Sequence, residues 1–338
     1  MSQQSEAVQL VEYAAVRLLL SFLGLLPRRL AIGLGCSLGR ITYHASRKLR
    51  STGERNLLLA FPDISPDERN RILRGCFTNL GRQLGLFSHF SKMTPEILAE
   101  IAETDGLGAF WEMLRAAQVK GSGVILVTAH LGAWELSSFG LSALGHPLSF
   151  PVRRIDNSRI ESFVDSIRTR FGNRSIDKRG GLRSMLKVLR AGGTLGLLMD
   201  INMLPREGIF VDFFGVPAST TFTVAQLALR TNATVIPVFV PWDNERKRYV
   251  LSLSAPVSIE HTGNEDEDIR RLTALLTQVI ENQVRRFPDQ WLWIHKRWRT
   301  RPPGEPDLYE NPPQISARRG SYPFQPFKHE EAPQNREP

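Results

Sequence analysis

A histidine and a glutamate five residues apart are the residues of this chain best suited to acid–base chemistry. His130 follows an apolar run, and Glu135 stands five residues further on. An imidazole with an ordinary pKa of about 6.5 accepts a proton at neutral pH, and a neighbouring carboxylate fixes its tautomer and stabilises the imidazolium. The pair therefore predicts a general base, with Glu135 folded back toward His130. The competing interpretation is a core histidine bonded to a nearby acid.

The apolar run before His130 predicts a buried strand. Residues 124–128 are mostly β-branched, and glycines flank the run on both sides. Such a run is typical of a strand covered on both faces in a mostly parallel sheet. Ligands bind at the carboxyl ends of strands in open α/β sheets, and His130 stands at such an end. Gly132 allows a sharp turn, after which residues 133–136 can begin a helix and return Glu135 to the imidazole.

Strand and helix patterns alternate over the rest of the chain, which predicts an α/β fold with a mostly parallel central sheet flanked by helices. Residues 54–118 are predicted to be helical and to cover one face of this sheet. Further strands are expected at residues 148–152, 175–176, 194–199, 234–240 and 249–254. Further helices are expected at residues 158–171, 182–190, 223–230 and 266–287.

Polar residues follow two of these strands. Arg153 and Arg154 come directly after residues 148–152, where paired guanidinium groups can bind a phosphate or a carboxylate. The competing interpretation of the two arginines is a solvated basic turn. Asp200 follows its strand as His130 follows its own, so we expect it to reach the same cleft in a supporting role.

The N-terminal segment combines apolar and basic residues. Residues 8–50 predict two helical segments broken at Pro27, with leucines gathered on one side. Residues 28–55 hold seven basic side chains and one acid, next to the apolar run 18–26. This combination favours an anionic membrane surface. Because the uncharged run is shorter than the ~20 residues needed to cross a bilayer, a helix lying in the interface is favoured over a span.

Composition narrows the class of protein further. The chain has 338 residues, enough for one large α/β domain, and a net charge of +9. It has no recognised nucleic-acid-binding motif, so nucleic acid is not an expected partner. Cys36 and Cys76 lack the neighbouring Cys and His residues of a zinc site, so no metal, cofactor or disulfide is expected. The first residues lack the positive start of a signal peptide, which predicts a protein that faces the cytoplasm.

A second catalytic pattern surrounds Ser37. Residues 35–39 match the Gly-x-Ser-x-Gly elbow that presents the nucleophile of serine hydrolases. An elbow follows a strand, however, and residues 28–34 have no strand alternation. Glycines four residues apart, Gly35 and Gly39, instead allow a helix to pack closely on another helix. A serine hydrolase built on Ser37 therefore stands only as an alternative.

The motif at His130 resembles that of a known enzyme family. The stretch His130-Leu-Gly-Ala-Trp-Glu135 is similar to the His-x4-Asp/Glu motif of lysophospholipid and glycerolipid acyltransferases. Over about residues 10–305 the chain more specifically resembles the late acyltransferases of lipid A biosynthesis, the lauroyl and myristoyl transferases. Matching stretches follow in order at residues 152–157, 180–183, 197–200, 211–218, 235–237 and 289–302. Met199 and Ile201 depart from the family, where a proline commonly precedes the aspartate and glutamine or histidine follows it.

The resemblance implies an enzyme that transfers a fatty acyl group from an acyl carrier protein or coenzyme A thioester to a membrane glycolipid. It implies a lipid A precursor as the acceptor and the cytoplasmic face of the inner membrane as the location. His130 would be the base, Glu135 its partner, and Arg153 the best candidate for binding anionic acceptor groups. Other acceptors, such as a phosphatidylinositol mannoside or an ornithine lipid, stay open, as does a non-catalytic membrane-binding protein.

Two aromatic stretches invite functional interpretations. The resemblance places residues 208–218 beside an acyl-binding groove, where Phe210, Phe213 and Phe214 would suit a fatty chain; core packing is the competing interpretation. This stretch is too apolar for a free loop and contains too many glycines for a regular element. Residues 291–301 combine three tryptophans with basic side chains, which suits a headgroup boundary. A cap over the sheet with exposed bases is the alternative.

The chain is predicted to have three parts. Residues 1–50 are a membrane-associating helical segment, and residues 51–301 form the α/β acyltransferase domain. From residue 302 onward nine of 37 residues are proline and the apolar periodicity is lost. We therefore expect residues 302–338 to be disordered and to carry no chemistry.

Overall fold

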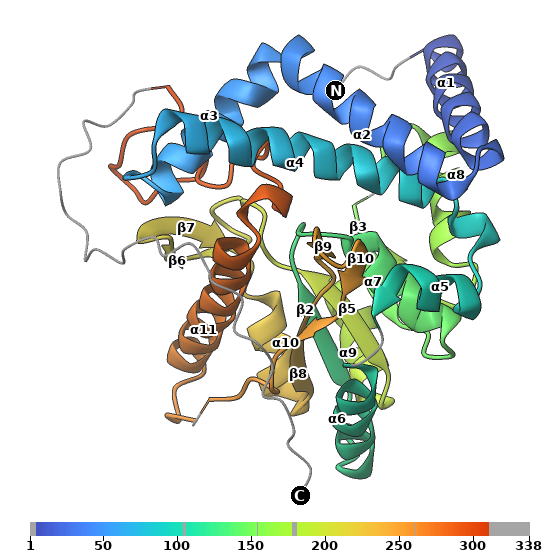
Figure 1. Ribbon diagram of the computed structural model, residues 1–338. Coiled ribbons are helices and arrows are strands. Elements are labelled where there is room, and N and C mark those ends of the chain that lie inside the picture. The colour runs from blue at the N-terminus through green and yellow to red at the C-terminus, as the bar shows by residue number, and fades with distance from the viewer. Residues whose placement is uncertain (1–4, 104–105, 154, 178–180, 260, 311–338) are drawn as a thin grey trace, which may run out of the picture.

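A computed structural model describes residues 5–103, 106–153, 155–177, 181–259 and 261–310 (Figure 1). It is a mixed α/β fold with an N-terminal layer of helices. The expected disorder from residue 302 onward is wrong for residues 302–310, because Leu308 is buried and the hydroxyl of Tyr309 donates to Asn56 Oδ1 at 2.6 Å. Residues 311–338 of the predicted tail lie outside the described residues. The same holds for Arg154.

Four consecutive helices begin the chain: α1 (Glu6–Leu25), α2 (Arg28–Ala45), α3 (Arg47–Ala60) and α4 (Pro66–Phe87). The predicted break at Pro27 is present, because proline lacks the N–H that a continuing helix would need. A second break at Ser46, whose hydroxyl caps α3, was not predicted. In Figure 1 these helices lie across the upper side of the molecule, along the edge of the central sheet.

Helices α2 and α4 pack at very close range through glycines. A Cβ atom added at Gly35 would lie 2.1 Å from the carbonyl oxygen of Gly81, and one at Gly39 would lie 2.1 Å from that of Phe77. Only glycine permits such an approach of two backbones. The predicted close packing is thus confirmed. Ser37 lies inside α2 and donates to the carbonyl oxygen of Gly33, so the strand–turn–helix geometry of a nucleophile elbow is absent at this serine.

The central sheet has six strands in the order β11-β8-β2-β5-β3-β4. These strands are β2 (Val124–Thr128), β3 (Ser149–Val152), β4 (Arg174–Asp177), β5 (Thr194–Leu198), β8 (Thr234–Phe239) and β11 (Ser252–Leu253). The pairs of β2 with β5 and β8 are parallel, as are those of β3 with β4 and β5.

The sheet is nevertheless mixed, which corrects the expected mostly parallel arrangement. Strand β11 pairs antiparallel with β8, and the predicted strand at 249–254 divides into β10 (Arg248–Val250) and β11. No helix lies between β8 and β11 to carry the chain back for a parallel pairing. Strand β10 joins β1 (Ala102–Glu103) and β9 (Trp242–Asp243) in a separate small sheet.

Strand β2 is apolar throughout because both of its faces are covered. Ile125 and Val127 belong to the core beneath α9 (Gly181–Arg190), α10 (Thr223–Thr231) and α11 (Glu265–Arg286). Val124 and Leu126 pack in a second core with α6 (Leu107–Val119) and part of α7 (Trp134–Ala143). Covering helices on both faces explain why the sequence of β2 is a continuous apolar run. The remaining helices are α5 (Pro95–Ile101), α8 (Ser158–Arg168) and the short 3-10 turns Phe90–Lys92 and Pro288–Gln290.

Residues 209–220 form a regular hairpin, which the sequence-based expectation for 208–218 missed. Strands β6 (Ile209–Phe213) and β7 (Val216–Thr220) pair antiparallel through a two-residue turn. Both turn residues, Phe214 and Gly215, have positive φ angles of 56° and 70°. Tight hairpins favour this conformation, but it is usually supplied by Asn-Gly or Asp-Gly, so Phe-Gly gave no recognisable turn signal.

Candidate active site

His130 lies at the carboxyl end of β2, at the edge of the sheet predicted for it. Its main-chain N–H donates to Asp200 Oδ2 at 2.8 Å, and its carbonyl oxygen accepts from the N–H of Leu292 at 3.1 Å. The imidazole is 21% exposed. The backbone of His130 is therefore anchored on both sides, while part of its side chain stays open to an incoming group.

Asp200 follows β5 and holds the imidazole from the neighbouring strand. His130 Nδ1 and Asp200 Oδ1 are 2.9 Å apart, and the Asp200 side chain is only 1% exposed. The indole Nε1 of Trp291 donates to Asp200 Oδ2 at 2.8 Å. Because Oδ2 is occupied by two N–H donors, Oδ1 is the oxygen that faces the imidazole.

Charge fixes the protonation of this pair. Burial raises the pKa of Asp200, but the charge of His130 and the hydrogen bonds from His130 and Trp291 lower it by more, so the carboxyl is ionised. Burial lowers the pKa of His130, but the charge and hydrogen bond of Asp200 raise it above its ordinary value. An ionised carboxylate can only accept, so Nδ1 carries the proton and Nε2 is the nitrogen left to act as a base.

Glu135 is not the hydrogen-bond partner of His130, which corrects the expected pairing. It lies in the first turn of α7, and its carboxylate forms a two-pronged ion pair with the guanidinium of Arg168 at the end of α8; one of the two bonds, from Nε to Oε2, measures 3.0 Å. The helix starting at Trp134 carries Glu135 toward α8 rather than back over the strand end. Its charge still raises the pKa of His130, so the two side chains belong to one electrostatic site.

The other predicted substrate-binding residues are dispersed. Arg153 is exposed just past the end of β3, as the sequence placed it, at the same edge of the sheet as His130. Phe213 and Phe214 are buried among aromatic side chains: Phe213 lies 5.5 Å from Trp291, and Phe214 lies 5.0 Å from Phe61, between ring centroids.

This packing favours the core interpretation of Phe213 and Phe214. Phe210 is only half-buried and pairs across the hairpin with Ser219. A role for any of these rings in binding a fatty chain stays a prediction, with Phe210 the best placed of the three.

The tryptophans of residues 291–301 are core residues, so the headgroup-boundary interpretation of this stretch was wrong. Trp291, Trp293 and Trp298 are each at most 1% exposed. Arg297 is buried with them, and its guanidinium donates to the carbonyl oxygen of Ser219 at 2.7 Å. The alternative, a cap with exposed bases, therefore also fails at Arg297.

Sequence reasoning missed the role of Trp291 because the role depends on a long-range pairing. Trp291 forms an isolated antiparallel bridge with Leu131, which lays its segment beside the end of β2. Nearby, His295 Nε2 accepts the N–H of Asn202 at 3.0 Å, and burial lowers the pKa of His295, so this imidazole is neutral. Asn202 also forms hydrogen bonds with Thr300, which join the segment after β5 to residues 291–301.

Other nucleophiles in the described residues are poorly placed. Ser37 is bonded to the carbonyl oxygen of Gly33 and to Arg40 on the surface of α2. Cys76 is buried, and burial raises the pKa of its thiol to about 12, so it stays protonated. Over the same described ranges, no three His, Cys, Asp or Glu side chains gather as a metal ion would require.

A strand-end histidine held by a buried carboxylate is an arrangement suited to acid–base chemistry. Comparison with known proteins shows which family the chain belongs to. Residues 1–300 match the model of the bacterial lipid A biosynthesis acyltransferase family. The chain belongs to this family and is an acyltransferase.

Individual relatives agree with the family assignment. The chain is 28% identical to the lipid A biosynthesis lauroyltransferase of Escherichia coli K12 over 288 residues, which cover 84% of this chain and 90% of the relative. It is 30% identical over 272 residues to a lipid A biosynthesis acyltransferase of Haemophilus influenzae, with 76% and 79% covered. It is 24% identical to the E. coli myristoyltransferase, with 81% and 82% covered.

Proposed function

We propose that this protein transfers a fatty acyl group from an acyl thioester to a hydroxyl group of a lipid A precursor by direct general-base catalysis. The observation that carries the proposal is the His130–Asp200 pair, which leaves Nε2 of a part-exposed imidazole as the proton acceptor. Membership in a family of lipid A acyltransferases supports the acceptor class.

The reaction needs one base and no covalent enzyme intermediate. As the acceptor hydroxyl oxygen bonds to the thioester carbonyl carbon, its proton passes to His130 Nε2. The resulting tetrahedral species then collapses as the carbon–sulfur bond breaks, and the departing thiolate takes the proton from the imidazolium. The products are an ester and a free thiol. A thioester is already activated, so alignment and proton transfer are sufficient.

Asp200 stabilises the imidazolium that forms midway. Its carboxylate is ionised and buried, and the interaction with a positive imidazole is strong because water is excluded from it. Trp291 and the main chain of His130 fix the carboxylate in place. Glu135 adds negative potential while its pair with Arg168 joins α7 to α8 beside the site.

Anionic groups of the substrates would be bound by arginines around this edge. Arg153 is exposed at the end of β3 and can reach phosphate groups of the acceptor. Arg154 is proposed for the same role from its sequence position alone. The donor is proposed to be an acyl carrier protein or coenzyme A thioester.

We also propose that residues 1–50 dock the enzyme on the cytoplasmic face of an anionic bilayer. Helix α1 is, among the described residues, the one helix long and apolar enough to cross a membrane, with a mean hydropathy of 1.5. Leu18 and Leu25 on α1 are 70% and 81% exposed, and Ile41 on α2 is 61% exposed. An apolar surface spread over two helices, beside the bases at residues 28–55, favours a segment lying in the interface.

Contacts between α1 and the catalytic domain support the interfacial arrangement. Asn157, which caps α8, donates to the carbonyl oxygen of Gln9 at 2.7 Å, and Tyr13 packs edge-on against Phe163 with 6.4 Å between ring centroids. These contacts hold the first half of α1 against α8. Vesicle pelleting tests the proposal: protein lacking residues 1–50 should fail to sediment with anionic vesicles, and full sedimentation of that protein would contradict it.

Product analysis tests the proposed reaction. Purified enzyme, a lauroyl thioester and a lipid A precursor should give a product heavier by one acyl group in an ester linkage, as seen by mass spectrometry. Phosphatidylinositol mannoside and ornithine lipid serve as competing acceptors in parallel reactions. Acylation of one of these lipids in preference to the lipid A precursor would contradict the proposed acceptor.

A further inference from the structure

Helix α9 presents an exposed row of basic side chains that the catalytic site does not use. Arg183, Lys187 and Arg190 are spaced four and three residues apart, so they follow one side of the helix for about 10 Å. All three are exposed, and α9 contains no acidic residue. Within the described residues, none of the three forms an ion pair. Their charges are therefore available to an anionic partner.

The position of Arg183 argues that the row serves more than the stability of α9. Lys187 and Arg190 lie in the last turn, where positive charge complements the helix dipole. Arg183 lies in the first turn, where positive charge opposes the dipole. A basic residue in the first turn destabilises the helix slightly. We therefore infer that Arg183 interacts with another molecule.

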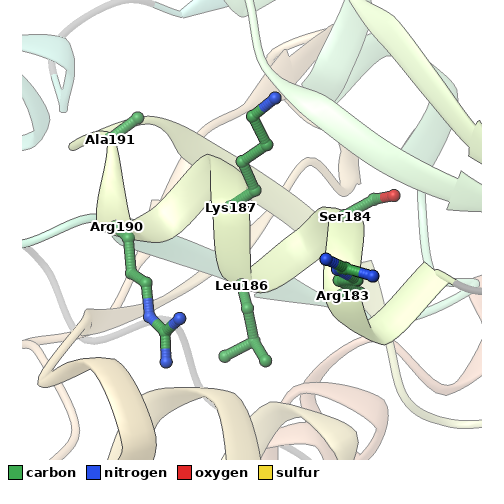
Figure 2. Close-up of a pocket in the computed structure, with 6 residues that line it drawn as sticks. All are labelled: Arg183, Ser184, Leu186, Lys187, Arg190 and Ala191. Atoms are coloured by element: carbon green, nitrogen blue, oxygen red, sulfur yellow. The ribbon is translucent and has the colours of Figure 1, made fainter.

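The three basic residues border a surface depression with an apolar centre. Arg183, Lys187 and Arg190 line a surface depression of about 570 Å³ together with Ser184, Leu186 and Ala191 (Figure 2). In Figure 2 Leu186 lies between Arg183 and Arg190, and the Lys187 side chain extends to the other side of the helix ribbon. An apolar centre with a charged rim is the usual anatomy of a protein–protein contact.

The location of α9 favours a partner from the aqueous phase. Helices α1 and α2, which carry exposed leucines, lie on the upper side of Figure 1, whereas α9 lies apart from them against the sheet. A partner docked on α9 is therefore not the membrane surface on which α1 and α2 are proposed to lie. Three charges spread over about 10 Å also match an extended acidic surface better than a single phosphate group.

The topology connects this surface to the reaction. Strand β4 ends at the carboxyl edge of the sheet, and β5 begins at the opposite edge, where Thr194 pairs with Val124. Helix α9 connects the two, so its first turn, with Arg183, lies toward the edge that holds His130 and Asp200. A partner bound along α9 could thus deliver a flexible thioester arm over this edge.

We propose that the basic face of α9 docks the protein component of an acyl donor, a small acidic helical acyl carrier protein. This inference rests on the proposed function, because it assigns a docking surface to one of the two donors proposed for that reaction. The partner's acidic helix would lie along the three bases, and its thioester-bearing arm would reach the cleft at His130. Charge attraction of this kind mainly raises the rate of association and sets partner choice.

Binding measurements on matched charge reversals test the proposal. The variant R183E/K187E should bind a lauroyl-loaded acyl carrier protein about tenfold more weakly than the parent at low ionic strength. The control R115E/K120E makes the same change in net charge at two exposed positions, one in α6 and one at its C-cap, on the other face of the sheet, and should bind within about twofold of the parent. Added salt should weaken the parent's binding more than that of R183E/K187E.

Two results would overturn the proposal: parental binding by R183E/K187E, or an equal loss in the α6 control. Transfer from lauroyl-coenzyme A is measured on the same proteins and should stay parental in both variants; an equal loss with this donor would mean that the face serves the fold or the acceptor. The neutral variant R183Q/K187Q should show a smaller loss of carrier binding in the same direction. If the parent bound the carrier but transferred no acyl group from either donor, the proposed function would fail while the docking surface stood.

Discussion

Two carboxylates lie near His130, and they differ in what holds them. Asp200 is buried, and its oxygens accept from the imidazole, the main chain of His130 and the indole of Trp291. Glu135 is 21% exposed at its side chain and is held by the guanidinium of Arg168. The carboxylate near His130 in sequence is thus engaged elsewhere, and one seventy residues away fixes the imidazole. Pairing of strands, rather than spacing in the chain, decides which acid serves the base.

Replacing Asp200 should have the larger effect of the two. In D200N the amide can donate toward Nδ1 and favour the tautomer with its proton on Nε2, so the base is lost. Turnover should fall by about 10²–10⁴-fold, the range that positioned proton transfer contributes. Single-turnover transfer from a lauroyl thioester measures it. Near-parental turnover in D200N would mean that Asp200 is only a structural residue.

Replacing Glu135 should cost less. E135Q removes a charge that raises the pKa of His130 and breaks the pair with Arg168, yet it leaves the imidazole bound by Asp200. We expect a loss of roughly tenfold to a hundredfold, at or below the bottom of the ~10²–10⁴-fold range for positioned proton transfer, because the base itself is kept. In the same assay, E135Q should therefore keep a higher rate of acyl transfer than D200N. The reverse order would return Glu135 to the role that its sequence position first indicated.

Trp291 provides a smaller and more specific test of the carboxylate's position. W291F keeps the buried ring but removes the N–H that binds Asp200 Oδ2. Losing one hydrogen bond to a charged group costs about 1.5–3 kcal/mol, and the lower figure corresponds to about a tenfold loss of rate. Since the freed carboxylate would also be less acidic, the pH profile of W291F should shift along with its rate. A rate loss with an unmoved profile would point to packing alone.

The pH dependence of the parent follows from the same pair. His130 acts as a base only when neutral, and Asp200 holds its pKa above the ordinary 6.5. Acyl transfer should therefore decline as the pH falls through a value above 6.5. The residual activity of D200N should decline at a lower pH than that of the parent, because the carboxylate that raises the pKa of the imidazole against its burial is gone. Initial rates across the pH range, with acceptor below saturation, measure the acidic side of the pH profile for the parent and for D200N. If the rates of the two proteins declined at the same pH, the proposed effect of Asp200 on the pKa of His130 would be contradicted.

The sequence predicted the edge of the sheet but not the pairing at that edge. Apolar runs before His130 and Asp200 identify two strand ends, and parallel strands bring such ends to one side. Which strands are neighbours is a long-range property: β2 and β5 pair so that Thr128 faces Leu198, and only this register brings Asp200 beside His130. A motif of neighbouring residues favours Glu135, because it carries no information about how β2 and β5 pair.

The tryptophans of residues 291–301 were misassigned, and the packing of Phe213 was not predictable, for a related reason. Trp291 and Phe213 belong to amphipathic or apolar stretches that suit a lipid boundary as well as a core. Their burial depends on the β6–β7 hairpin, whose Phe214-Gly215 turn carries no familiar turn sequence. By contrast, the contact between α2 and α4 was predictable from Gly35 and Gly39, since few features other than close packing require glycines four apart in a helix.

The central claim is that His130 removes the acceptor's proton directly, without an acyl-enzyme. The most direct measurement is single-turnover transfer from a radiolabelled lauroyl thioester by the parent, H130A and S37A, with denaturing gels to detect label on the protein. H130A should be slower by about 10²–10⁴-fold or more, S37A should stay within a few-fold of the parent, and no protein should carry label. Near-parental turnover in H130A, or stoichiometric label that disappears in S37A, would contradict the mechanism.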